Sequence, residues 1–259
     1  MNALNCLVIL AGAWLLSPPA QSQGFQIEEP RHFSDPKLTA IILSSNQATK
    51  QTVQLVNQGR VKGAYFYLSD FQKKNPNAYD MTEDVGIECA LMVGKVEEAY
   101  RRAKVWYSKP GHESDDARIR LVLAQALQGY SSDVELQFAR SAYHQSLFPS
   151  QTKDTLVIPT RMLGTSSETA ILSCLAMAFK TPGQMSNEFF EMALKIDPAN
   201  YFAAREDIRN YEFRGQYSKI RRVANSTIRY MPSGQQRAEM ISILEHVKNL
   251  KDTPIQQVH

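Results

Sequence analysis

The chain has 259 residues, with 29 Lys and Arg against 26 Asp and Glu, and a formal net charge of +3. A charge this small for the length argues against nucleic acid as the main partner. Three cysteines are too few for a small scaffold held together by disulfides.

The first 22 residues have the pattern of a signal peptide. From Ala3 to Leu16 only Asn5 is strongly polar and no residue is charged. This apolar run is shorter than the roughly 20 residues that span a bilayer. Ala20 and Ser22 then offer small residues where a signal peptidase cleaves. We expect cleavage after Ser22 and an exported chain, periplasmic or secreted, with no membrane span; the alternative is a retained anchor.

Residues 23–44 are predicted to form an arm or linker, because they contain two prolines and charges of both signs. An alternative prediction is that their last part, "LTAIILSS", begins an extra helix. Asp35 and Pro36 suit the start of such a helix. Its apolar side chains would cover the open end of the domain that follows.

Residues 45–250 repeat one pattern, in which a glycine separates two segments with apolar residues at helical spacing. Thirty-five residues separate Gly59 from Gly94, and thirty-five separate Gly94 from Gly129. In the first copy a small residue, Ala64, follows the turn and Pro76 ends the second segment. A period in the mid-thirties is typical of stacked helical hairpins.

Five such units are predicted, followed by an amphipathic closing helix at 235–250 and a tail at 251–259. The third unit departs from the pattern, since Val134 stands where a small residue is expected and Pro149 comes late. Residues 150–166 interrupt the spacing as an insertion, either a surface loop or a contributor to binding. The units are 45–78, 79–113, 114–149, 167–200 and 201–234.

Three strings of the sequence resemble the tetratricopeptide repeat family: "GRVKGAYFYLSDFQKKNPNA", "GKVEEAYRRAKVWYSKPG" and "FFEMALKIDPAN". The family's tryptophan near the start of each unit is absent. The resemblance implies an all-α fold, a right-handed superhelical solenoid of antiparallel helix pairs with a concave groove. It implies about five repeats and a C-terminal capping helix. A related helical-repeat family of similar period is the alternative.

Motifs that would carry a reaction are missing from the sequence. The five histidines are not paired at metal-ligand spacing, and there is no Gly-x-Ser-x-Gly elbow or phosphate-binding glycine loop. Cys89 and Cys174 lie among apolar residues of first helices, too far apart in the repeat array for a disulfide. We therefore expect no catalytic residue, no metal and no cofactor.

The resemblance implies that ligand contacts come from the first helix of each unit, on its inward face. The third and fourth units would supply an apolar middle, and the outer units polar ends. This arrangement suits an extended segment or an amphipathic helix of a partner protein. The expected groove residues are Asn46, Thr49, Lys50, Val53, Asn57, Asp84, Glu88, Met92, Arg205, Arg209, Glu212 and Phe213, and those of the apolar middle are Ile119, Leu123, Leu127, Ile171, Leu175 and Phe179.

Charge is uneven along the chain. Residues 80–116 hold nine acids and five bases, whereas residues 201–259 hold ten bases and six acids. The two ends would attract each other head to tail, or the basic end would bind an acidic partner, or the charges are ordinary solvated helix faces. The arginines of the basic end include Arg205, Arg209, Arg214, Arg221, Arg222 and Arg229.

The sequence favours an exported, non-catalytic module that binds a protein or peptide partner as a scaffold, adaptor or assembly factor. One alternative is a chaperone-like protein that grips secreted clients with the apolar middle. Another is an enzyme, or the regulatory subunit of an envelope enzyme, with chemistry at residues 150–166.

Overall fold

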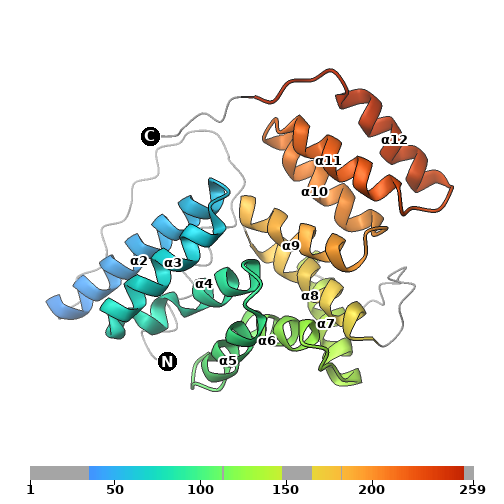
Figure 1. The fold of residues 1–259 in the computed structure, drawn as a ribbon. Coiled ribbons are helices and arrows are strands. Elements are labelled where there is room, and N and C mark those ends of the chain that lie inside the picture. Colours follow the sequence, from blue (N-terminus) through green and yellow to red (C-terminus); the bar gives the residue numbers. More distant parts are fainter. Residues whose placement is uncertain (1–34, 113, 148–164, 182, 254–259) are drawn as a thin grey trace. The chain divides into compact units, whose positions relative to one another are not determined.

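Helices account for every regular element in the described part of the chain (Figure 1). The structure is a computed structural model that describes residues 35–112, 114–147, 165–181 and 183–253. Over those residues it contains eleven α-helices and one 3-10 helix, packed mostly against their neighbours in sequence. The predicted all-α class is confirmed, and the packing is consistent with a helical repeat array.

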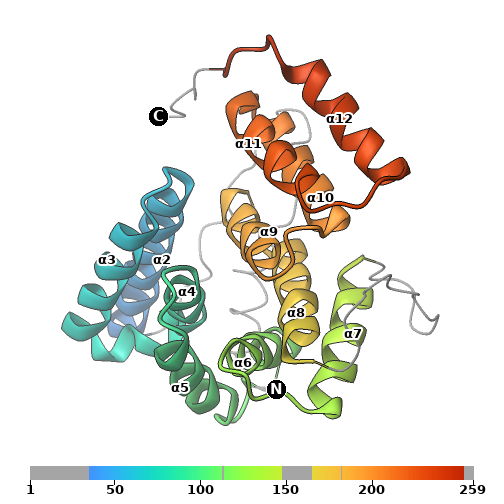
Figure 2. The same cartoon turned by 45° about the vertical axis from the view of Figure 1, so that its right-hand side comes forward.

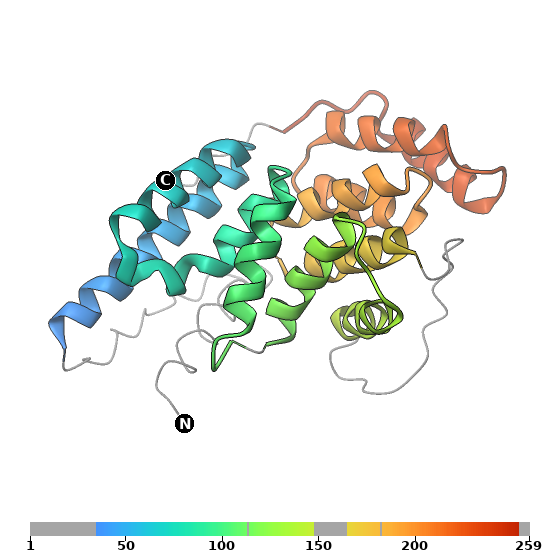
Figure 3. The same cartoon turned by 60° about the horizontal axis from the view of Figure 1, so that its bottom comes forward.

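The chain divides into two compact units, Met1–Ala124 and Gln125–His259. In the first unit α2 packs against α3, both pack against α4, and α5 packs against α4. Figure 3 shows α2 and α3 as an antiparallel pair. The helices of this unit are α2 (Pro36–Asn57), α3 (Val61–Lys74), the 3-10 helix η1 (Pro76–Ala78), α4 (Tyr79–Met92), α5 (Val96–Tyr107) and most of α6 (Asp115–Leu127).

In the second unit, each helix from α8 to α11 packs against the one before it and the one after it (Figure 2). The last three helices share a core that contains Ile208, Tyr211, Ile220 and Met240. The helices of this unit are α7 (Asp133–Leu147), α8 (Ser166–Lys180), α9 (Gln184–Ile196), α10 (Tyr201–Phe213), α11 (Tyr217–Ile228) and α12 (Gln235–Val247).

Four of the turns between successive helices share one hydrogen-bond pattern, centred on a glycine. At Gly59 the N–H donates to the carbonyl of Val56, at 2.8 Å, and the N–H of Arg60 donates to that of Leu55, at 2.9 Å. Both bonds recur at the other three glycines, and all four have φ between 64° and 84°. This is the Schellman cap, which favours glycine because φ is positive. The glycines are Gly59, Gly94, Gly129 and Gly215.

The small residues and prolines of the pattern also take their predicted places. Ala64, Ala193 and Ala224 are fully buried, so neighbouring helices approach closely there. Helix α3 ends at Lys74, two residues before Pro76, because proline cannot continue the helical hydrogen bonds.

The turn between α6 and α7 keeps its glycine but is longer than the others. Helices α3, α5 and α11 begin two residues after their glycine, whereas α7 begins four residues after Gly129, at Asp133. This shift leaves Val134 64% exposed and buries Leu136. The departure seen in the sequence at Val134 is therefore a change of register, not a large residue in the core.

The arm predicted at 23–44 does not end where we expected. Helix α2 starts at Pro36 and runs without a break to Asn57, with the Asp35 carboxylate accepting a hydrogen bond from the Lys37 N–H. Residues 36–44 therefore belong to the first helix of the first pair, and no element boundary lies at residue 44. The predicted signal peptide at 1–22 and almost all of the 150–166 insertion lie outside the described residues.

The start of the predicted C-terminal tail is held against the α10–α11 pair. The Asp252 carboxylate accepts hydrogen bonds from the backbone N–H and the hydroxyl of Ser218, at the beginning of α11. The Thr253 N–H donates to the Gly215 carbonyl at 2.9 Å. Residues 252 and 253 are therefore part of the packed second unit.

Cys89 and Cys174 are fully buried free thiols, in α4 and α8. Their predicted placement as small core residues of first helices is confirmed. Burial raises the pKa of Cys89 to about 12 and raises that of Cys174 as well. Both side chains stay protonated and act as apolar packing.

Candidate functional site

The groove residues expected on α2 form a partly exposed polar strip. Asn46, Lys50 and Asn57 are exposed, while Thr49 and Val53 are half-buried. These positions recur every three or four residues, so they share one side of the helix. The strip is accessible, as expected, but it lines neither of the two pockets described below.

The expectation for α4 needs a correction at Glu88. Its side chain is buried, and Oε1 accepts hydrogen bonds from Nη2 and Nε of Arg120 in α6, at 2.6 and 3.1 Å. Burial is the main cause that raises the pKa of Glu88, although Arg120 opposes the shift. Glu88 therefore joins α4 to α6 and cannot meet a ligand at the surface. Asp84 and Met92 remain half-buried.

The apolar middle is mostly core. Four of its six residues are at most 3% exposed, and the other two, Leu127 and Phe179, are half-buried. Their apolar surface is used to pack helices against one another, so they do not form an open apolar floor. The four buried residues are Ile119, Leu123, Ile171 and Leu175.

The residues expected on α10 lie along one exposed strip of that helix. Arg205 pairs with Glu239 of α12 at 3.6 Å, and Arg209 pairs with Glu206 at 3.8 Å. Phe213 is 79% exposed. It lines a pocket of about 320 Å³ at the α8–α9 turn, together with Phe179. The structure thus brings together two of the predicted residues, one from the groove set and one from the apolar middle.

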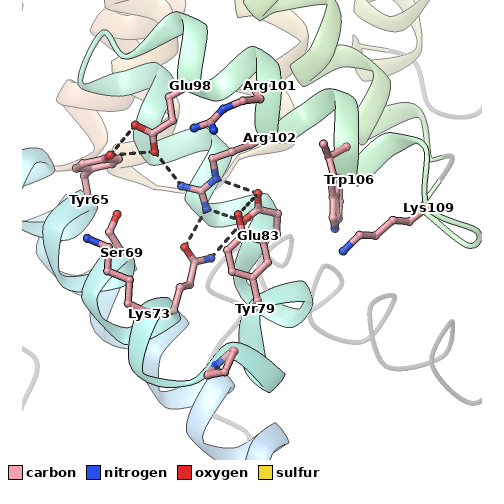
Figure 4. Close-up of a pocket in the computed structure, with 13 residues that line it drawn as sticks. Tyr65, Ser69, Lys73, Tyr79, Glu83, Glu98, Arg101, Arg102, Trp106 and Lys109 are labelled. Carbon is pink, nitrogen blue, oxygen red and sulfur yellow. Dashed lines mark hydrogen bonds and ion pairs between the residues drawn. The ribbon is translucent and has the colours of Figure 1, made fainter.

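A larger pocket, of about 740 Å³, lies in the first unit between α3 and α5 and is called the α3–α5 pocket below (Figure 4). Its volume falls within the roughly 300–1,000 Å³ of typical ligand sites. Each helix contributes side chains at helical spacing, and α4 and η1 contribute the rest. The pocket is lined by Tyr65, Ser69, Gln72 and Lys73 of α3, Pro76 of η1, Tyr79 and Glu83 of α4, and Glu98, Arg101, Arg102, Val105, Trp106 and Lys109 of α5 and its end.

Arg102 is the centre of a hydrogen-bonded network that fixes the walls of the α3–α5 pocket. Its guanidinium makes a two-pronged ion pair with Glu83, with Nη2–Oε2 at 2.5 Å and Nε–Oε1 at 2.9 Å. Nη2 also donates to the Gln72 side-chain oxygen at 2.9 Å. Burial opposes the charge of Arg102, but Glu83 more than offsets this and raises the pKa of Arg102. Residues of α3, α4 and α5 are thereby held together.

The network needs a glycine in the middle of α4. A Cβ placed on Gly86 would lie 2.1 Å from Nη2 of Arg102. Any larger residue would therefore push the guanidinium away from Glu83. The lack of a side chain at Gly86 is what lets Arg102 reach the surface of α4.

The second carboxylate of the pocket is also fully engaged. Glu98 accepts hydrogen bonds from the Tyr65 hydroxyl at 2.9 and 2.7 Å and lies 3.4 Å from Arg102 Nη1. Lys95 approaches it at 3.6 Å. Partial burial would raise the pKa of Glu98, but the Tyr65 hydrogen bond and the two cations lower it overall. Neither Glu83 nor Glu98 is placed to act as a free base.

Three further cations surround the pocket. Lys109 pairs with Asp80 of α4. In the part of the chain that the structure describes, Lys73 and Arg101 form no ion pair. Tyr79 and Val105 add exposed apolar surface, at 36% and 57% exposure. The pocket therefore combines the positive charge of Lys73 and Arg101, which is unpaired within the described ranges, with apolar contact area.

This pocket was not predicted from the sequence, because ligand contacts were expected on first helices, whereas α3 and α5 are second helices. The helical spacing of residues on α3 could have indicated the pocket. Tyr65, Ser69, Gln72 and Lys73 share one face of α3, and that face includes an aromatic residue, whereas a solvated face carries only charged and polar residues.

Among the described residues, no group of His, Cys, Asp and Glu side chains is arranged to hold a metal ion. The helices in these ranges are all too short or too polar to span a bilayer. Comparison with protein-family models, curated proteins and solved structures finds no match.

Proposed function

We propose that this chain is a non-catalytic interaction module, and that the α3–α5 pocket docks a segment of a partner protein. The observation that carries the proposal is the pocket itself, open to solvent and bordered by helices of two successive pairs. Its walls are preorganised by the Arg102 network, so little ordering is needed when a segment binds.

The two carboxylates of the pocket are hydrogen-bonded and ion-paired, and this supports the proposal that the chain is not catalytic. A general base needs a carboxylate that is free to take a proton from a substrate. Glu83 is held by Arg102, Gln72 and Tyr79, and Glu98 is held by Tyr65 and Arg102. These contacts give both carboxylates a structural role.

We also propose a more detailed description of the fold. We propose that the helix pairs wind as a right-handed superhelix of the tetratricopeptide type, with α12 as its closing helix. The four shared glycine caps and the predicted period of 35 residues support this. From the pattern of residues 1–22 we propose that the protein is exported, and that it serves as scaffold, adaptor or assembly factor there.

Affinity capture with matched variants tests the docking function. The full chain is used as bait in its native extract, beside Val105→Glu and Val134→Glu. Both valines are exposed, at 57% and 64%, but only Val105 lines the pocket. We expect a stoichiometric partner that is retained by the unmodified chain and by Val134→Glu but lost by Val105→Glu.

A partner that Val105→Glu keeps at full yield would contradict the docking site. Capture of many unrelated proteins, equally by all three baits, would instead indicate a chaperone-like binder. Circular dichroism of each bait verifies that the substitutions leave the helices intact.

A further inference from the structure

The Trp106 indole lines the α3–α5 pocket with an unsatisfied hydrogen-bond donor. Its side chain is 6% exposed, and within the described ranges Nε1 has no hydrogen-bond partner. An indole N–H can only donate, so the missing partner is an acceptor. Buried donors without a partner are rare and call for an explanation. A ligand that brings an acceptor into the pocket provides one.

Positive charge lies beside this donor. Figure 4 shows the Trp106 indole nitrogen and the Lys109 ammonium directed to the same part of the pocket. The ammonium also pairs with Asp80, whose side chain is 52% exposed. Because an ammonium has three N–H groups, Lys109 can contact a second acceptor without releasing Asp80. An acceptor placed near Nε1 is therefore favoured if it carries negative charge.

The rest of the pocket also favours a negatively charged ligand. Its two acids already have cationic partners within the walls, Glu83 in Arg102 and Glu98 in Arg102 and Lys95. Lys73 on α3 and Arg101 on α5 have no such acidic partner in the described structure. Both are exposed, so they attract anions from solution and set the rate of encounter.

We propose that the α3–α5 pocket selects an acidic segment of a partner protein. One carboxylate of the segment accepts hydrogen bonds from Trp106 Nε1 and Lys109, and other acidic side chains lie near Lys73 and Arg101. Apolar side chains of the segment contact Val105 and Tyr79. This inference rests on the proposed docking function and adds the chemistry of the bound segment.

Selection from random peptides tests the preference without knowledge of the partner. A displayed library of random 12-residue peptides is panned on the full chain and depleted on the Lys73→Gln/Arg101→Gln variant. We expect the survivors to be enriched in Asp and Glu and to contain apolar residues. In a synthetic survivor, replacing every acid by its amide should weaken binding at least about tenfold, because charged hydrogen bonds are lost.

The binding constant is read from the emission of Trp106 in a Trp14→Phe background, where it is the sole tryptophan. We expect Lys73→Gln/Arg101→Gln to lower affinity about tenfold at low salt, and less at high salt. Lys74→Gln/Lys104→Gln removes the same charge from exposed positions outside the pocket and should leave affinity within about twofold.

Calorimetry of Trp106→Phe isolates the indole N–H, since phenylalanine keeps an aromatic ring. We expect about tenfold weaker binding of the acidic peptide, with a lower thermal midpoint because phenylalanine does not fill the whole volume of the buried indole. Unchanged affinity would remove the indole from the site and overturn the proposal.

Two further outcomes distinguish a failure of the acidic preference from a failure of the docking function. Survivors that depend on the pocket but have no excess of acids would overturn the acidic preference while docking stands. If no survivor depends on the pocket and Val105→Glu still captures the native partner, the docking function fails as well.

Discussion

The buried carboxyl of Asp207 shows how far one residue can depart from its ordinary chemistry. Asp207 is fully buried in α10, where Oδ1 accepts a hydrogen bond from the Asn187 amide and Oδ2 has no partner in the described structure. Burial is the main cause that raises its pKa to about 8; Glu191 adds to the shift, while Asn187, Arg222 and Arg214 oppose it. The carboxyl is therefore largely neutral at pH 7.

This shift makes the stability of the protein depend on pH. The folded state holds the Asp207 proton up to about pH 8, whereas the unfolded chain releases it near its ordinary pKa of 3.8. The contribution of Asp207 to the free energy of unfolding should therefore be most favourable below about pH 4, fall as the pH rises, and level off above about pH 8. Asp207→Asn mimics the neutral form and should remove this fall.

We expect Asp207→Asn to be more stable than the unmodified chain at pH 8 by on the order of a few kcal/mol, and equal to it at pH 4. Urea denaturation at both pH values measures this. Glu212→Gln, at an exposed position of the same helix, is the control and should change stability by less than about 0.5 kcal/mol. Equal stability of Asp207→Asn and the unmodified chain at pH 8 would contradict the buried neutral carboxyl.

Single residues were the hardest feature to predict from the sequence. Glu88 looked like a surface acid because its neighbours Asp84 and Met92 share its side of α4. Its burial depends on Arg120, 32 residues away, which local periodicity does not reveal. Gly86 likewise has no local reason to be a glycine until Arg102 is seen to lie against it.

At the scale of elements, the repeated glycine cap decides where each hairpin turns. Gly94 has a φ of 80°, and a Cβ there would have open space around it. A side chain at this position meets no neighbour, so any cost of substitution comes from the backbone. Left-handed backbone costs a residue with a Cβ about 1–2 kcal/mol.

Two glycine-to-alanine substitutions test this reasoning with opposite signs. Gly94→Ala should lower the free energy of unfolding by about 1–2 kcal/mol. Gly63→Ala, inside α3, places its Cβ at an ordinary 3.8 Å from that of Arg60 and should raise it by about 0.5–1 kcal/mol. Thermal and urea denaturation of the full chain measure both. A Gly94→Ala variant as stable as the unmodified chain would show that the cap does not require glycine.

The positions of the turns and helix ends were the most predictable feature, because the residues that fix them act locally. The cap glycine, the small residue after it and the terminating proline each act locally, so their spacing in the sequence carries over to the fold. The length of α2 was less predictable. Asp35 and Pro36 marked the correct start, but nothing local showed that the helix continues unbroken to Asn57.

At the scale of the whole molecule, many charges of the two uneven stretches are paired within their own unit. Three acids of the 80–116 stretch, Asp80, Glu83 and Glu88, are paired with Lys109, Arg102 and Arg120. In the second unit Arg205 and Arg222 pair with Glu239 and Glu191. Of these five pairs, only Glu88 with Arg120 and Arg222 with Glu191 draw a partner from outside the stretch. These contacts leave less free charge for head-to-tail attraction than the sequence alone indicates.

The candidate site was beyond the reach of the sequence for a related reason. A pocket depends on which helix faces are left uncovered when pairs pack, and the periodicity shows only which faces are apolar. The α10 residues predicted for the groove do share one exposed strip, because that placement depends on a single helix. The α3–α5 pocket needed Tyr65, Arg102 and Trp106 to be brought together from two pairs.

Site-specific photocrosslinking tests directly whether a partner protein binds in the α3–α5 pocket. A photoreactive amino acid is placed at Val105 in the α3–α5 pocket, at Lys50 in the strip on α2, or at Val134 in the second unit. Each chain is irradiated in native extract and its adducts are compared by mass. We predict an adduct with one partner protein from position 105 and none from position 134. An adduct from position 50 or 134 with none from position 105 would contradict this prediction.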